Sequence, residues 1–98
     1  MIVKFKHDII IIDNKDNVGT AVRDLANGKE AIAELPDGEK LKIVLLEDIP
    51  AYHKVSIKEI IKNENIIKYG FPIGKSAFRI QKGKHVHTHN ITTNQGGF

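Results

Sequence analysis

Three of the five histidines in this chain lie at every second position of one short stretch, as His85, His87 and His89. In an extended strand, side chains two residues apart point to the same face, whereas a helix would distribute them around its axis. If residues 83–90 form a strand, the spacing therefore places all three imidazoles on one face. Neutral imidazole nitrogens on one face are ligands for zinc, iron or manganese, so the stretch is a candidate metal site.

A plainer interpretation accounts for the same spacing. Polar residues at alternate positions are also typical of the solvent-facing side of any half-buried strand, and histidine is common on protein surfaces. The spacing alone leaves both interpretations open.

Composition limits the classes of protein to which the chain can belong. Its 98 residues are 41% hydrophobic, which predicts a single domain over residues 1–98 with a modest core. The absence of cysteine excludes a disulfide framework and a thiolate metal site. The net charge of +3 comes from dispersed lysines, which does not favour a nucleic-acid partner. The longest apolar run, residues 9–12, is too short to cross a membrane, so we expect a soluble, cytoplasmic protein.

The elements that must position the histidines are predicted to be strands and tight turns. Asn27-Gly28 is a strong hairpin signal, and Pro36-Asp37-Gly38 is typical of a second turn. Gly70 and Gly74 flank three residues where we expect a sharp turn. The predicted strands cover residues 2–5 with an extension to 12, then 18–25 pairing with 30–35, and a buried strand at 41–46.

Residues 56–64 support two assignments. Ser56 and Glu59 fit a helix capping box that precedes isoleucines at helical spacing. A 20-residue internal repeat argues for strands instead, because it implies two similar hairpins, and residues 25–31 form a weaker third copy. We therefore predict strand over residues 53–61. The repeat matches Ser56 with Ser76, Ile60 with Ile80, Lys62 with Lys82, Asn63 with Gly83 and Ile66 with Val86.

Five short motifs in order along the chain carry a resemblance to a known family. They are Asp16-Asn17-Val18, His53-Lys54-Val55, residues 67–70, residues 72–74 and residues 83–90. Over residues 13–94 the chain resembles the N-terminal domain of the altronate and galactarate dehydratases. The resemblance implies a mostly β domain of the SAF type, with a β-clip fold of short, bent strands and hairpins.

The resemblance also implies a function. We expect a small subunit or N-terminal domain of a sugar-acid dehydratase, a hydro-lyase, which acts with a large catalytic subunit and is inactive alone. Two alternatives remain open: the small subunit of a sulfolactate sulfo-lyase, and a non-catalytic domain that binds sugar acid or holds subunits together. Assembly into a homo-oligomer is also left open. The cofactor implied is a divalent metal, iron or manganese rather than zinc.

Dehydration of a sugar acid removes the proton alpha to a carboxylate and expels a hydroxyl from the next carbon. The reaction needs a base, an acid and positive charge near the carboxylate. We predict that Lys54 and Lys68 bind the carboxylate and that Tyr69 donates a proton. The predicted metal ligands are His85, His87 and His89, with Asp13 or His7 as a further ligand, whereas His53 is expected to be an ordinary capped or exposed histidine.

Two positions depart from the family pattern. Many members have a histidine shortly before the Asp-Asn-Val turn, where this chain has Asp13 and Asn14. Members commonly have glycine before the His-Lys pair, where this chain has Tyr52. The second departure makes the local backbone conformation at Tyr52 an open question.

Overall fold

The computed structural model describes residues 6–92, and over this range the chain forms short strands and no helix. No helix in that range is therefore long and apolar enough to cross a lipid bilayer. The mostly β architecture predicted from the sequence is confirmed, while the strand predicted over residues 2–5 lies outside the described residues. The strands are β1 (Ile9–Ile10), β2 (Val18–Ala21), β3 (Glu30–Glu34), β4 (Lys40–Val44), β5 (Lys54–Ser56), β6 (Asn65–Lys68), β7 (Phe71–Ser76), β8 (His85–Val86) and β9 (Ile91–Thr92).

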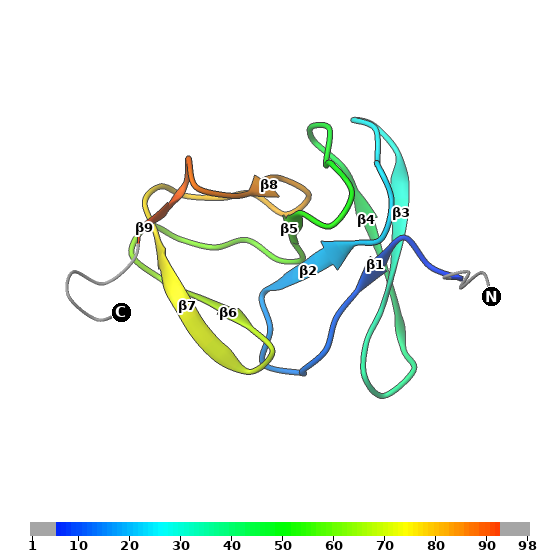
Figure 1. Ribbon diagram of the computed structural model, residues 1–98, viewed down its shortest axis with the longest axis horizontal. Coiled ribbons are helices and arrows are strands. Elements are labelled where there is room, and N and C mark those ends of the chain that lie inside the picture. The colour runs from blue at the N-terminus through cyan, green and yellow to red at the C-terminus, as the bar shows by residue number, and fades with distance from the viewer. Residues whose placement is uncertain (1–5, 93–98) are drawn as a thin grey trace.

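The strands form two sheets. A six-stranded sheet has the order β4-β3-β1-β2-β5-β8, and a three-stranded sheet has the order β6-β7-β9. All neighbouring pairs are antiparallel except β1 and β3, which run parallel. The β3–β4 and β6–β7 hairpins lie at opposite ends of the molecule (Figure 1).

The hairpin predicted between residues 18–25 and 30–35 is wrong. Strand β2 ends at Ala21 and pairs with β1 and β5, whereas β3 pairs with β4 and β1. Residues 22–29 turn away from β2 because Leu25 forms an isolated bridge with Ile49 instead of continuing the strand. The strand predicted to be buried at 41–46 is only half-buried, since Ile43 is 0% exposed and Val44 is 54% exposed.

One local structure occurs four times, in residues 21–29, 45–53, 56–64 and 76–84. In each copy the fifth residue forms a bridge, and the last four residues make a turn closed by a hydrogen bond from the amide of the ninth residue to the carbonyl of the sixth. The eighth residue has a positive φ, as the third residue of a type II turn requires. Those residues are Gly28 (88°), Tyr52 (70°), Asn63 (70°) and Gly83 (92°).

The four copies associate as two pairs. In the first pair, Leu25 bridges Ile49, and in the second, Ile60 bridges Ile80. Within the second pair the amide of Asn63 donates to the carbonyl of Ser76, and the amide of Gly83 donates to that of Ser56. This exchange confirms the 20-residue repeat. No helix forms over residues 53–61, as predicted, but the predicted strand is reduced to β5 (Lys54–Ser56) and the bridge at Ile60.

The turn predicted across residues 71–73 is wrong. The chain reverses at Tyr69 and Gly70, whose φ angles of 57° and 81° are those of a type I′ hairpin turn. Strand β7 then continues to Ser76, with a bulge opposite Ile66 and Ile67. Gly74 lies inside this strand, where a Cβ would be 2.7 Å from Ile91 Cγ2, so the glycine lets β9 approach β7 closely.

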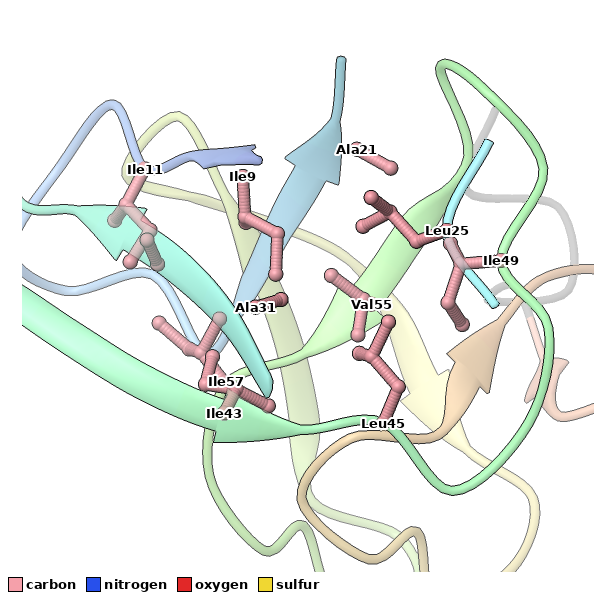
Figure 2. Close-up of a cluster of buried hydrophobic side chains, with 11 residues drawn as sticks. Ile9, Ile11, Ala21, Leu25, Ala31, Ile43, Leu45, Ile49, Val55 and Ile57 are labelled. Atoms are coloured by element: carbon pink, nitrogen blue, oxygen red, sulfur yellow. The ribbon is translucent and has the colours of Figure 1, made fainter. Parts of the chain in front are cut away.

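Two clusters of buried aliphatic side chains hold the fold together. In the larger one, Ile9, Leu45 and Val55 point into a common interior from separate segments (Figure 2). The smaller one lies between the two sheets' edges and consists of Val18, Ile60, Ile66, Ile80 and Val86. Each fully buried aliphatic side chain contributes about 1.5–3 kcal/mol, so both clusters matter for a domain of this size.

Candidate metal centre beside strands β5 and β8

Three imidazoles meet at the edge of the six-stranded sheet. The ligand nitrogens of His53, His85 and His87 all lie within 4.8 Å of one another. His53 Nδ1 is 2.8 Å from His85 Nε2, and the rings of His53 and His87 stack with centroids 4.5 Å apart. All three side chains are half-buried. We call this group the histidine triad.

Pairing of two strands positions the triad. Strands β5 and β8 are antiparallel, with Val55 opposite His85 and Lys54 opposite Val86. Val86 is 0% exposed and packs in the smaller cluster, which directs its neighbours His85 and His87 to the other face. His53 reaches the same place because it ends the second copy of the repeated turn, where its amide donates to the carbonyl of Pro50.

The predicted histidine strand is shorter than expected. Strand β8 ends at Val86, and residues 87–90 form a turn in which the amide of Asn90 donates to the carbonyl of His87 over 3.0 Å. The buried amide side chain of Asn90 accepts from the amide of His87 and donates to the carbonyl of His85. Asn90 therefore fixes the spacing between these two triad members.

His89 lies beside the triad and is not part of it. Its ring centroid is 5.3 Å from that of His85 in a tilted arrangement, and its side chain is exposed. His85 and His87 share a face as predicted, but the third imidazole is His53, which the sequence pattern had suggested was an ordinary histidine. Its position depends on the pairing of β5 with β8, 32 residues away. Only the His53-Lys54-Val55 motif pointed to this segment.

The surroundings of His85 and His87 favour their neutral forms. Burial, together with His53, His89 and His87, lowers the pKa of His85, although Glu47 acts in the opposite direction. Burial also lowers the pKa of His87, with further contributions from His53, Lys54 and His89. A neutral imidazole is the form that binds metal, so these shifts preserve the ligand form at neutral pH.

A cleft of about 410 Å³ borders the triad. Lys54, Ile73, His87, Thr88 and Ile91 line it. Burial lowers the pKa of Lys54, and the charge of Lys68 on β6 lowers it further. The structure thus brings Lys54, Lys68 and His87 into one neighbourhood.

Tyr69 lies next to Lys68 and contacts its side chain. The Lys68 ammonium lies 4.7 Å from the centroid of the Tyr69 ring, a cation–π contact, while the tyrosine is 51% exposed. Its conformation is set by the neighbouring turn: the amide of Gly70 donates to the buried carboxylate of Asp16 over 2.8 Å.

The two further ligands that the sequence suggested lie elsewhere. Asp13 accepts from the amide of Lys15 and lies against the turn at Gly70, where its Oδ2 would be 2.9 Å from a Cβ. His7 is 3.8 Å from the carboxylate of Glu34 on β3. Within residues 6–92, neither belongs to a group of potential ligands with the triad, and the third potential ligand beside His85 and His87 is His53.

Comparison with known proteins agrees with this architecture. Residues 7–94 match the family model described as the altronate/galactarate dehydratase SAF domain. Altronate dehydratase of Bacillus subtilis is 39% identical over 85 residues, which are 87% of this chain and 16% of that enzyme. The Escherichia coli altronate dehydratase is 40% identical over 79 residues, or 81% of this chain and 15% of the enzyme.

A third relative is much shorter than the two dehydratases. The (2R)-sulfolactate sulfo-lyase subunit alpha of Chromohalobacter salexigens is 32% identical over 88 residues, which are 88% of this chain and 94% of that subunit. The chain therefore spans a small part of the dehydratases and nearly all of this subunit. The family model covers all three histidines of the triad, the cleft residues and both copies of the 20-residue repeat. The chain belongs to the altronate/galactarate dehydratase SAF domain family.

Proposed function

We propose that this chain contributes a metal-binding face to a sugar-acid dehydratase whose larger catalytic part lies in a partner subunit or a further domain. The observation that carries the proposal is the histidine triad, with donor nitrogens within 4.8 Å of one another. Relatives in which the matching region is a small part of a much longer dehydratase support the requirement for a larger partner.

The chemistry assigns a role to each residue near the triad. His53, His85 and His87 hold a divalent ion, which would supply positive charge for a carboxylate or an enediolate. Imidazole nitrogens suit both iron and zinc, so the choice between metals is made by experiment. Lys54 and Lys68 attract the acid substrate, and Tyr69, whose ring centroid lies 4.7 Å from the Lys68 ammonium, donates the proton.

A sulfo-lyase is the second candidate function. The matched sulfolactate sulfo-lyase subunit alpha is covered over 94% of its length, so this chain has the size of that subunit. Altronate, galactarate and sulfolactate all carry a carboxylate, and the groups eliminated from them differ. A domain common to these enzymes is therefore suited to the shared carboxylate, while the larger part acts on the leaving group.

Reconstitution tests the function. The chain is copurified with a candidate large dehydratase subunit from the same genome, and altronate, galactarate and sulfolactate are assayed with each component alone and with both. We expect one of the three acids to undergo elimination, and only when both protein components are present. Full activity of the large subunit alone would instead support a domain used only for assembly.

Calorimetric titration with iron, manganese and zinc tests the metal site in the isolated chain. Alanine at His53 or His87 should weaken binding at least about tenfold, because each change removes a ligand. His89→Ala is the matched control and should bind as the wild type does. Val86→Ala should leave metal binding intact and destabilise the fold by about 1–3 kcal/mol, because Val86 is 0% exposed. Equal binding by wild type and His53→Ala would contradict the site.

A further inference from the structure

We propose that the cleft between Lys54 and His87 is a subsite for a carboxylate group. It would hold the acid end of a polyhydroxy acid whose remaining atoms lie at the histidine triad. This inference rests on the function proposed above and assigns its substrate-binding residues.

The lining of the cleft fits one carboxylate of a polyhydroxy acid. Lys54, His87 and Thr88 supply polar groups that can donate hydrogen bonds, and a carboxylate only accepts them. The side chains of Ile73 and Ile91 form the apolar part of the wall and pack against the smaller buried cluster. The volume of about 410 Å³ lies within the range of small-molecule sites.

The charge of Lys54 is uncompensated. Lys29, Lys42 and Arg79 each have a carboxylate within 4.0 Å, but no carboxylate of residues 6–92 lies that close to Lys54 or Lys68. Lys54 is nevertheless half-buried and lines the cleft. A half-buried cation in the wall of a cleft is stabilised when an anion binds there, so the site favours a carboxylate over an uncharged ligand.

The position of the cleft determines which part of the ligand faces the triad. His87 belongs to both the cleft wall and the triad. A carboxylate bound at Lys54 therefore lies beside the three imidazoles, with the adjoining carbons of the acid directed toward them. The carbon next to the carboxylate is the one that loses its proton in a dehydration.

Titration of the full chain in the presence of a chelator tests the subsite without metal. Galactarate and the uncharged galactitol are added separately to the isotopically labelled chain, and backbone amide NMR signals are followed. Galactarate should give saturable shifts at Thr88 and Ile91, and galactitol should give none. Lys54→Gln should weaken galactarate binding about tenfold, because it removes a charge-assisted hydrogen bond. Lys62→Gln is the control, because it removes an equal charge from an exposed turn.

Three results would overturn the subsite: no saturable binding of galactarate to the wild type, equal shifts from galactitol, or unchanged affinity in Lys54→Gln. The amide spectrum of Lys54→Gln shows whether the variant is folded, so a loss of binding cannot be mistaken for unfolding. Metal binding to His53→Ala and His87→Ala is measured separately. Metal binding without galactarate binding would reject only the subsite. Galactarate binding without metal binding would reject only the metal site.

Discussion

At the scale of single residues, the triad depends on Tyr52, a neighbour that has no chemical role in it. Tyr52 has a φ of 70° and its side chain is 76% exposed. It occupies the position at which the sequence resemblance led us to expect glycine, and the structure gives a reason for that expectation: the turn that precedes His53 has a left-handed residue there. The bulky side chain at this position therefore holds a backbone conformation that favours glycine.

Tyr52→Gly should therefore stabilise the chain by about 1 kcal/mol, because a bulky residue in the left-handed region is strained and the exposed ring buries little. Urea denaturation measures the change. Tyr52→Ala retains a Cβ in the same conformation and should remain within about 0.5 kcal/mol of the wild type. A glycine variant no more stable than the alanine variant would show that the turn is not strained.

The lowered pKa of His85 predicts a pH dependence of stability in the metal-free chain. As the pH falls through about 6.5, the unfolded chain binds a proton at this histidine before the folded chain does. The stability is therefore fully present above that pH and is lost as the pH falls toward the lowered pKa of the folded state. Urea denaturation at pH 7.5 and 5.5 should show a smaller loss in His85→Asn than in the wild type. An equal loss in both proteins would contradict the prediction.

At the scale of elements, the fourfold turn is one backbone shape in four different environments. Gly28 and Gly83 occupy the same position in their copies, with φ angles of 88° and 92°. A Cβ on Gly28 would meet nothing within 4 Å, whereas one on Gly83 would overlap the carbonyl oxygen of Val44. Gly28 is needed only for its backbone conformation. Gly83 also lets the backbone of Val44 pack closely against it, two residues before His85.

Asparagine separates these two roles, because it tolerates the left-handed conformation and already occupies the equivalent position at Asn63. Gly28→Asn should cost less than about 1 kcal/mol, since only conformation is affected. Gly83→Asn should cost about 3 kcal/mol or more, because backbone atoms of Val44 must move. Thermal unfolding of the two variants makes the comparison. Equal costs would mean that the contact with Val44 relaxes freely.

At the scale of the whole molecule, the site is open to solvent. The triad and its cleft lie at the edge of the six-stranded sheet, against the smaller cluster, and the cleft has Thr88 exposed at its wall. An elimination from a polyhydroxy acid needs groups on more than one side of the substrate and exclusion of water. Within residues 6–92 the exposed wall at Thr88 leaves the cleft open to water.

The purified chain should consequently show no measurable dehydration of altronate or galactarate, even when loaded with metal. Release of the keto-acid product is the measurement. The mixture with the large subunit is the positive control, and His53→Ala in the same mixture should lose most of the activity. Rapid turnover by the chain alone would require a complete active site on this one face.

Local patterns were enough to identify the class of fold and the family. Alternating histidines, Gly and Asn at turn positions and the 20-residue repeat each report on the backbone of a few consecutive residues. They correctly predicted a mostly β chain, strand instead of helix at residues 53–61, and a common face for His85 and His87. They did not predict which strands pair, because partners such as β1 and β3 are distant in sequence and their register is set by burial of both faces.

The members of the site were decided by tertiary structure. His85 and His87 are brought to one face by local alternation, but His53 joins them only because β5 pairs with β8, and His89 is left out because β8 ends at Val86. The meeting of Lys54 with Lys68 likewise depends on packing between the two sheets. A local pattern predicts the direction of a side chain along its own strand, whereas a site built from several strands depends on which strands lie side by side.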